Sequence, residues 1–68
     1  MMNVPVTEQV YAFICAYQRE HGYPPTQREI AKNCYLAHSS VGYHLDRLED
    51  EGRILREPGR ARGITLLH

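Results

Sequence analysis

The sequence predicts an α+β domain in which three helices are followed by a two-stranded antiparallel β-hairpin. Two segments, at about residues 8–20 and 39–51, repeat apolar side chains every three or four positions, which is the period of one helix face. A short capped segment at about 27–34 lies between them, and two apolar runs flank a proline-glycine turn at about 54–67. A chain of 68 residues can form only one small core, so we expect a single domain over residues 1–68.

The first helix is expected to begin after Thr7, because a threonine side chain accepts a hydrogen bond from the amides of the first turn. Gly22 suits the left-handed conformation that ends many helices, and the prolines at 24–25 prevent continuation. The apolar face of this helix consists of Val10, Phe13, Ile14 and Tyr17.

A second, shorter helix is predicted by the segment Thr26-Gln27-Arg28-Glu29, which has the form of a capping box. Its apolar period ends at Cys34 after two turns, and Ser39 or Ser40 then offers a fresh N-terminal cap. The expected arrangement is a short helix, a tight turn and a third helix.

The third helix has one apolar and one polar arc, and Gly52 ends it. Strands are expected on either side of the turn at 58–62. The apolar arc holds Val41, His44, Leu45 and Leu48, and the polar arc holds Ser39, Tyr43, Asp46, Arg47 and Asp50.

Charge is balanced over the whole chain but not along it. Eight basic and eight acidic residues give a formal net charge of zero, so a general attraction to polyanions is not expected. The last 16 residues nevertheless concentrate positive charge against a single Glu57, in the side chains of Arg53, Arg56, Arg60 and Arg62.

The order and spacing of short motifs resemble the N-terminal DNA-binding domain of the LexA repressor family, and the resemblance covers nearly the entire chain. The motifs are Tyr23-Pro24-Pro25-Thr26, Arg28-Glu29-Ile30-Ala31, His44-Leu45 with Leu48, Gly52 before Ile54, and Arg62-Gly63-Ile64. The resemblance implies a winged helix-turn-helix fold, with the third helix in the major groove of double-stranded DNA and the hairpin as a wing on the backbone. It also implies sequence-specific binding by a small transcriptional regulator, expected to be a repressor.

Two departures limit what the resemblance carries over. The turn before the third helix is one residue shorter than in the family, which affects the register of that helix and its base contacts. The side chains at the base-contacting positions also differ from those of the family, so the target sequence is not transferred. The family continues into a self-cleaving domain with a serine-lysine dyad, whereas the given sequence ends at His68. We therefore expect no enzymatic activity, and the chain is either a small regulator or the DNA-binding fragment of a larger one.

Base contacts are expected from the start of the third helix, where small residues let the backbone approach the groove. By resemblance, the base-contacting positions are Ser39, Ser40, Gly42 and Tyr43. Tyr43 either contacts DNA or lies over a neighbouring turn. Arg47 either reaches a phosphate or a guanine, or pairs with Asp50 or Glu51 on its own helix.

Phosphate contacts are expected from two further segments. Arg60 and Arg62 either touch the DNA backbone from the wing or belong to an ordinary solvated turn. Thr26, Gln27 and Arg28 stand at a helix start, where free amides attract phosphate, although Thr26 is also the cap.

Other functions find little support in the sequence. The cysteines and histidines lack the spacing of a zinc site, so we expect no metal, cofactor or small-molecule substrate. No signal peptide or long apolar run is present, so we expect a cytoplasmic protein without membrane contact.

The main alternative is a winged-helix protein-interaction module. On DNA, we expect a homodimer or a partner subunit, because single modules bind weakly.

Overall fold

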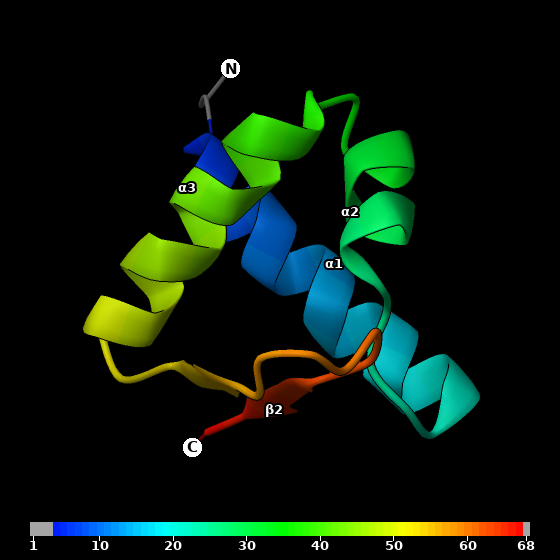
Figure 1. Ribbon diagram of the computed structural model, residues 1–68. Helices are drawn as coiled ribbons and strands as arrows, with labels where there is room; N and C mark the ends of the chain where they lie inside the picture. Colours follow the sequence, from blue (N-terminus) through cyan, green and yellow to red (C-terminus); the bar gives the residue numbers. More distant parts are fainter. Residues whose placement is uncertain (1–3, 68) are drawn as a thin grey trace.

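Three helices precede a two-stranded antiparallel sheet in the computed structural model, which describes residues 4–67 (Figure 1). The predicted α+β class and the order of the elements are confirmed. The elements are α1 (Val6–His21), α2 (Gln27–Asn33), α3 (His38–Asp50), β1 (Ile54–Arg56) and β2 (Ile64–Leu66). Within residues 4–67, no helix combines the length and the apolar character needed to cross a membrane.

The start of α1 differs from the prediction, because Thr7 is not its cap. The helix begins at Val6, and its N-cap residue is Pro5, which makes no side-chain capping bond. Pro5 has a φ of −55°, which its ring restricts, and an extended ψ of 145°, and the next residue begins the first turn. The Thr7 hydroxyl instead forms a hydrogen bond of 2.7 Å with Nδ1 of His44, so this side chain joins α1 to α3.

The predicted capping box of α2 is confirmed by two reciprocal hydrogen bonds. The amide of Glu29 donates to Oγ1 of Thr26 at 3.1 Å, and the amide of Thr26 donates to Oε1 of Glu29 at 2.8 Å. The chain therefore turns sharply from the Tyr-Pro-Pro connector into α2.

The turn between α2 and α3 differs from the prediction, because no serine caps α3. Tyr35 takes a left-handed φ of 56°, and the amide of Leu36 donates to the carbonyl of Ala31 at 2.9 Å. These features match a Schellman ending, in which glycine usually occupies the left-handed position. The helix then begins at His38 with Ala37 as its N-cap residue, so neither Ser39 nor Ser40 caps it.

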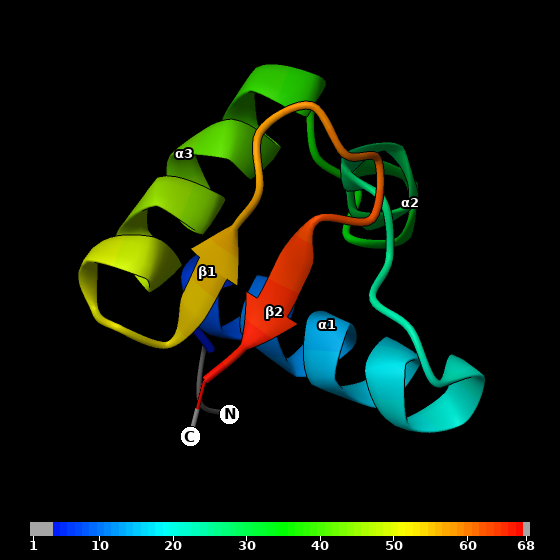
Figure 2. The same ribbon diagram turned by 60° about the horizontal axis from the view of Figure 1, so that its bottom comes forward.

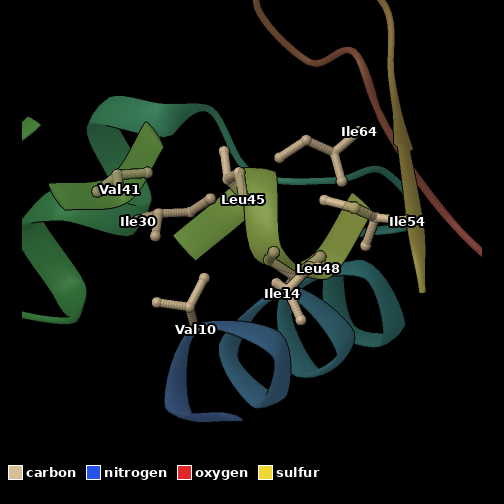
Figure 3. Packing of buried hydrophobic residues seen from close by; sticks show 8 residues of the cluster. All are labelled: Val10, Ile14, Ile30, Val41, Leu45, Leu48, Ile54 and Ile64. Carbon is tan, nitrogen blue, oxygen red and sulfur yellow. The ribbon is translucent and has the colours of Figure 1, made fainter. Parts of the chain in front are cut away.

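The core lies where the three helices and both strands meet (Figure 3). The expected apolar arc of α3 is confirmed for its three aliphatic members, while His44 is half-buried at its edge. Phe13 packs half-buried at the margin of the core, and Tyr17 is also half-buried. The buried apolar side chains are Val10, Ile14, Ile30, Val41, Leu45, Leu48, Ile54 and Ile64.

The hairpin is shorter than expected, with Leu55 opposite Thr65 at its centre. Both of these side chains are exposed, while Ile54 and Ile64 turn inward. At the neck of the hairpin, the amide of Glu57 donates to the carbonyl of Gly63 at 2.7 Å. A Cβ atom on Gly63 would lie 2.6 Å from the carbonyl oxygen of Glu57, so only glycine fits. Figure 2 shows the wing loop, residues 57–63, beside the start of α2.

Replacing Leu45 by Ala is expected to lower the free energy of unfolding by about 2–5 kcal/mol, because it leaves a cavity between α3 and its neighbours. Leu55→Ala is the matched control: Leu45 has 0% of its surface exposed and Leu55 has 51%. The control should stay within about 0.5 kcal/mol of the original protein in urea denaturation. Equal losses for both variants would contradict this description of the core.

Candidate nucleic-acid interface

The outward face of α3 presents small polar residues followed by one aromatic ring. Ser39 is exposed, and Ser40 and Gly42 are half-buried. Among residues 4–67, and apart from Gly42 itself, its two chain neighbours and the adjacent backbone of its own helix, no atom lies within 4 Å of the place where a Cβ on Gly42 would stand, so packing does not require glycine there. The missing side chain leaves the helix backbone open to a large ligand at this point.

Tyr43 and Arg47 form a row along the same face. Tyr43 is 57% exposed, and its ring meets the ring of His44 edge-on at 5.1 Å between centroids. Nη1 of Arg47 donates to the Tyr43 hydroxyl at 3.4 Å, and Nη2 lies 3.9 Å from a carboxylate oxygen of Glu51. The pair with Glu51 is therefore present, but an exposed pair of this length is weak and leaves Arg47 free to turn toward another anion.

A groove next to the start of α3 brings together three segments that are distant in the sequence. Its volume is about 420 Å³, and no acidic side chain lines it. The side chain of Arg60 is 72% exposed, and within residues 4–67 Arg28 forms no ion pair. The lining residues are Thr26, Gln27 and Arg28 from the start of α2, His38 from the start of α3, and Arg60 and Ala61 from the wing loop.

His38 and Ala61 are the two lining residues that the sequence did not predict as DNA contacts. The sequence predicts the helix start at Ser39 or Ser40, which leaves His38 in the preceding turn. The sequence gives no signal for this helix start, because the turn before it depends on a left-handed Tyr35. Glycine is the residue that usually indicates such a position.

Arg62 lies apart from this groove, although the sequence grouped it with Arg60. Its Nη1 donates to the carbonyl of Pro24 at 2.9 Å and to Oε1 of Glu29 at 2.9 Å. The guanidinium also lies over the ring of Tyr23, 4.7 Å from its centroid. Contact between Arg62 and phosphate stays a prediction, and this side chain already has acceptors within the protein.

The other two arginines of the basic C-terminal segment are also paired. Arg53 binds the carboxylate of Glu8 with both terminal nitrogens and stacks on Tyr11, 4.0 Å from the ring centroid. Arg56 binds Asp46 and also Glu49, the latter at 3.1 Å. The four arginines therefore do not form one basic patch, and the groove takes its positive charge from Arg28 and Arg60.

The cysteines and histidines form no metal centre in the part of the chain that the structure describes, since no group of three or more potential ligands lies together. Cys15 and Cys34 are free and half-buried. Burial raises the pKa of the Cys34 thiol, which makes it less reactive.

These elements define a winged helix-turn-helix DNA-binding domain. The helix-turn-helix consists of the short helix α2, the tight turn and α3 with its exposed polar face, and the wing is the hairpin whose loop lies beside the start of α2. The chain belongs to the LexA DNA binding domain family, whose model matches residues 6–63. The predicted fold and family are confirmed.

Several similar proteins are named as LexA repressors. "LexA repressor 2" of Geobacter sulfurreducens is 48% identical over 58 residues, which cover 84% of this chain and 29% of that protein. "LexA repressor" of Clostridium botulinum strain Hall is 47% identical over 60 residues, with 87% and 30% covered. "LexA repressor 1" of Geobacter sulfurreducens is 44% identical over 64 residues, with 93% and 32% covered. The chain thus spans about a third of the length of these relatives.

Glu29 is expected to make stability depend on pH. The hydrogen bond from Arg62, followed by those from Thr26 and Tyr17, lowers the pKa of Glu29 to about 2 from an ordinary value of 4.5. A depressed pKa means that the ionised carboxylate stabilises the fold above about pH 4.5 and that this contribution is lost as the pH falls through about 2.

The free energy of unfolding of the original protein should therefore exceed that of Glu29→Gln near neutral pH, and the gap should narrow in acid. Urea denaturation at a series of pH values measures both. A gap that stays constant down to about pH 2 would show that Arg62 does not hold the carboxylate in its charged form.

Proposed function

We propose that this chain is the DNA-reading part of a transcriptional repressor, with α3 in the major groove of double-stranded DNA and the wing on the sugar-phosphate backbone. The observation that carries the proposal is the groove at the start of α3. It places Arg28 and Arg60 beside the exposed polar face of the helix, without an acidic residue in its lining. A phosphate in this groove would hold α3 at the base edges.

Base reading is assigned to Ser39, Ser40, Gly42 and Tyr43. The two hydroxyls of the serines can donate to or accept from base edges, and Gly42 lets the backbone come close. The ring of Tyr43 offers an apolar surface to a thymine methyl group and a hydroxyl to a polar edge. We assign Arg47, one turn further along, to a phosphate or a guanine, which it would contact by leaving Glu51.

Backbone contacts are assigned to Thr26, Gln27, Arg28 and Arg60, and we add His38 because it lines the same groove. Such contacts fix the position of the protein on the duplex and carry no sequence information themselves. Their number is small, so the affinity of one copy should be low. We propose that two copies bind an inverted repeat, or that a second subunit supplies the pairing.

The cellular location that we propose follows from DNA as the ligand. Bacterial relatives named as repressors and a DNA-binding family support action on DNA in a bacterial cytoplasm. We assign no catalytic step to the described residues, since their arrangement serves binding.

Selection from a random pool of duplex DNA at low salt tests the proposal. We expect enrichment of one short motif, present as an inverted repeat where two copies bind. Weak binding without an enriched motif would contradict sequence reading and would favour the protein-interaction alternative.

Two substitutions should separate base reading from backbone contact. Arg60→Ala is expected to weaken binding by a similar factor on every sequence and to reduce the slope of log affinity against log salt by about one. Tyr43→Ala should change the preferred base at one or two positions of the motif. Arg19→Ala, which removes an exposed arginine of α1 outside the groove, is the charge-matched control.

Affinities are measured by fluorescence anisotropy on the selected duplex and on single-base variants, at several salt concentrations. An unchanged salt slope for Arg60→Ala would exclude a phosphate contact by this residue. Loss of the folded circular dichroism spectrum in Tyr43→Ala would show that the ring belongs to the core.

A further inference from the structure

One carboxylate joins three separate segments next to the groove. Oε1 of Glu29 accepts the amide of Thr26, which starts α2, at 2.8 Å. Oε2 accepts the hydroxyl of Tyr17 from α1 at 3.1 Å. Both oxygens accept from Arg62 of the wing loop, at 2.9 and 3.3 Å. The start of α2 and the wing are thereby connected across 33 residues of sequence.

The donors of Arg62 bind acceptors within the protein, although its side chain is 38% exposed. Nη1 donates to Pro24 and Glu29 and lies 3.4 Å from the hydroxyl of Tyr17, while Nη2 donates to Glu29. The flat guanidinium lies over Tyr23, so its face is also covered on one side. These contacts occupy Nη1 and one donor of Nη2, so a phosphate reaches the side of the guanidinium that faces Glu29 only by displacing these acceptors. The bidentate fit to a carboxylate is a property of arginine that lysine lacks.

From these contacts we infer that Arg62 is a positioning residue, which clamps the wing loop to α2 through Glu29 and so holds Arg60 at the phosphate groove. The inference rests on the DNA-binding function proposed above, and it replaces the direct phosphate contact that the sequence suggested for Arg62. We call the interaction between Arg62 and Glu29 the wing clamp.

The wing needs such support because its own strands are short. Each strand has three residues, and a two-stranded hairpin is marginally stable by itself. Beyond the neck bond between Glu57 and Gly63, the backbone of the loop is closed only by a 3.4 Å hydrogen bond from Arg60 to Glu57 among the described residues. Arg60 is two residues from Arg62, so fixing one guanidinium restricts where the other can reach.

The charge of Glu29 gives the inference a test with a distinctive sign. A carboxylate near the DNA repels phosphate, so its removal should strengthen binding if only charge mattered. The wing clamp predicts the opposite, because Glu29→Gln releases Arg62 and with it the wing. Glutamine is also a regular member of a capping box, so the start of α2 is retained.

Anisotropy on the selected duplex should therefore show about three- to tenfold weaker binding for Glu29→Gln, the order of a lost phosphate contact, with the preferred sequence unchanged. Arg60→Ala should cost less affinity in the Glu29→Gln protein than in the original protein, because the wing is already released. The matched control is Glu8→Gln, which removes the carboxylate partner of Arg53 and should leave affinity close to the original value.

Arg62→Lys provides a second, independent variant. It keeps the positive charge, so a direct phosphate contact would retain most of the affinity and the salt slope. The wing clamp predicts that Arg62→Lys weakens binding as much as Glu29→Gln does. Circular dichroism and urea denaturation check that each variant is folded.

Unchanged or tighter binding by Glu29→Gln, or full retention of affinity by Arg62→Lys, would overturn the wing clamp while leaving the DNA-binding function intact. Failure of the original protein to bind any selected duplex would instead remove the proposed function itself. The two failures are therefore distinguishable in one set of titrations.

Discussion

The packing of α3 through Val41, Leu45 and Leu48 determines what the rest of the molecule can do. These three side chains are fully buried and belong to a core of eight buried aliphatic residues within residues 4–67. Their spacing of four and three residues fixes the rotation of the helix about its axis, because a turn in either direction would bring an apolar residue into water. The opposite arc, with Ser39, Tyr43 and Arg47, consequently faces outward. In the proposed function, recognition and folding use the two sides of one helix.

The two ends of α3 differ in their electrostatics, and this difference gives the domain a direction. Its N-terminal end borders a groove that carries Arg28 and Arg60. Its C-terminal end is acidic, and Asp46 and Glu49 take up Arg56 there. We therefore expect a duplex to be attracted to one end and repelled from the other, even though the formal net charge of the chain is zero.

Local patterns in the sequence were sufficient for the elements and for much of the candidate site. The apolar periods predicted the helix faces, and the Thr26-to-Glu29 motif predicted a capping box that the structure contains. The start of α3 was misplaced because Tyr35 adopts a left-handed conformation that its side chain does not announce. The cap assigned to Thr7 was wrong because Pro5 begins the helix and His44 engages the hydroxyl.

The ion-pair partners of Arg53 and Arg62 could not be predicted from the sequence, because they are distant along the chain. Arg53 meets Glu8 across 45 residues, and Arg62 meets Glu29 across 33. Such pairs depend on how the hairpin docks on the helices, which no local pattern encodes. A segment that is rich in arginine therefore divides into three side chains that pair with other elements and Arg60, which pairs with Glu57 on the same exposed loop.

The measurement that tests this account most directly is a nuclear magnetic resonance titration of the isotope-labelled protein with a selected duplex. We expect the largest chemical-shift changes at the amides of residues 38–43, with further changes at 26–28 and 60–61, which line the groove. The exposed outer face of the hairpin around Leu55 and Thr65 should change little. Changes concentrated on that outer face or at the acidic end of α3 would contradict the placement of DNA against the start of α3.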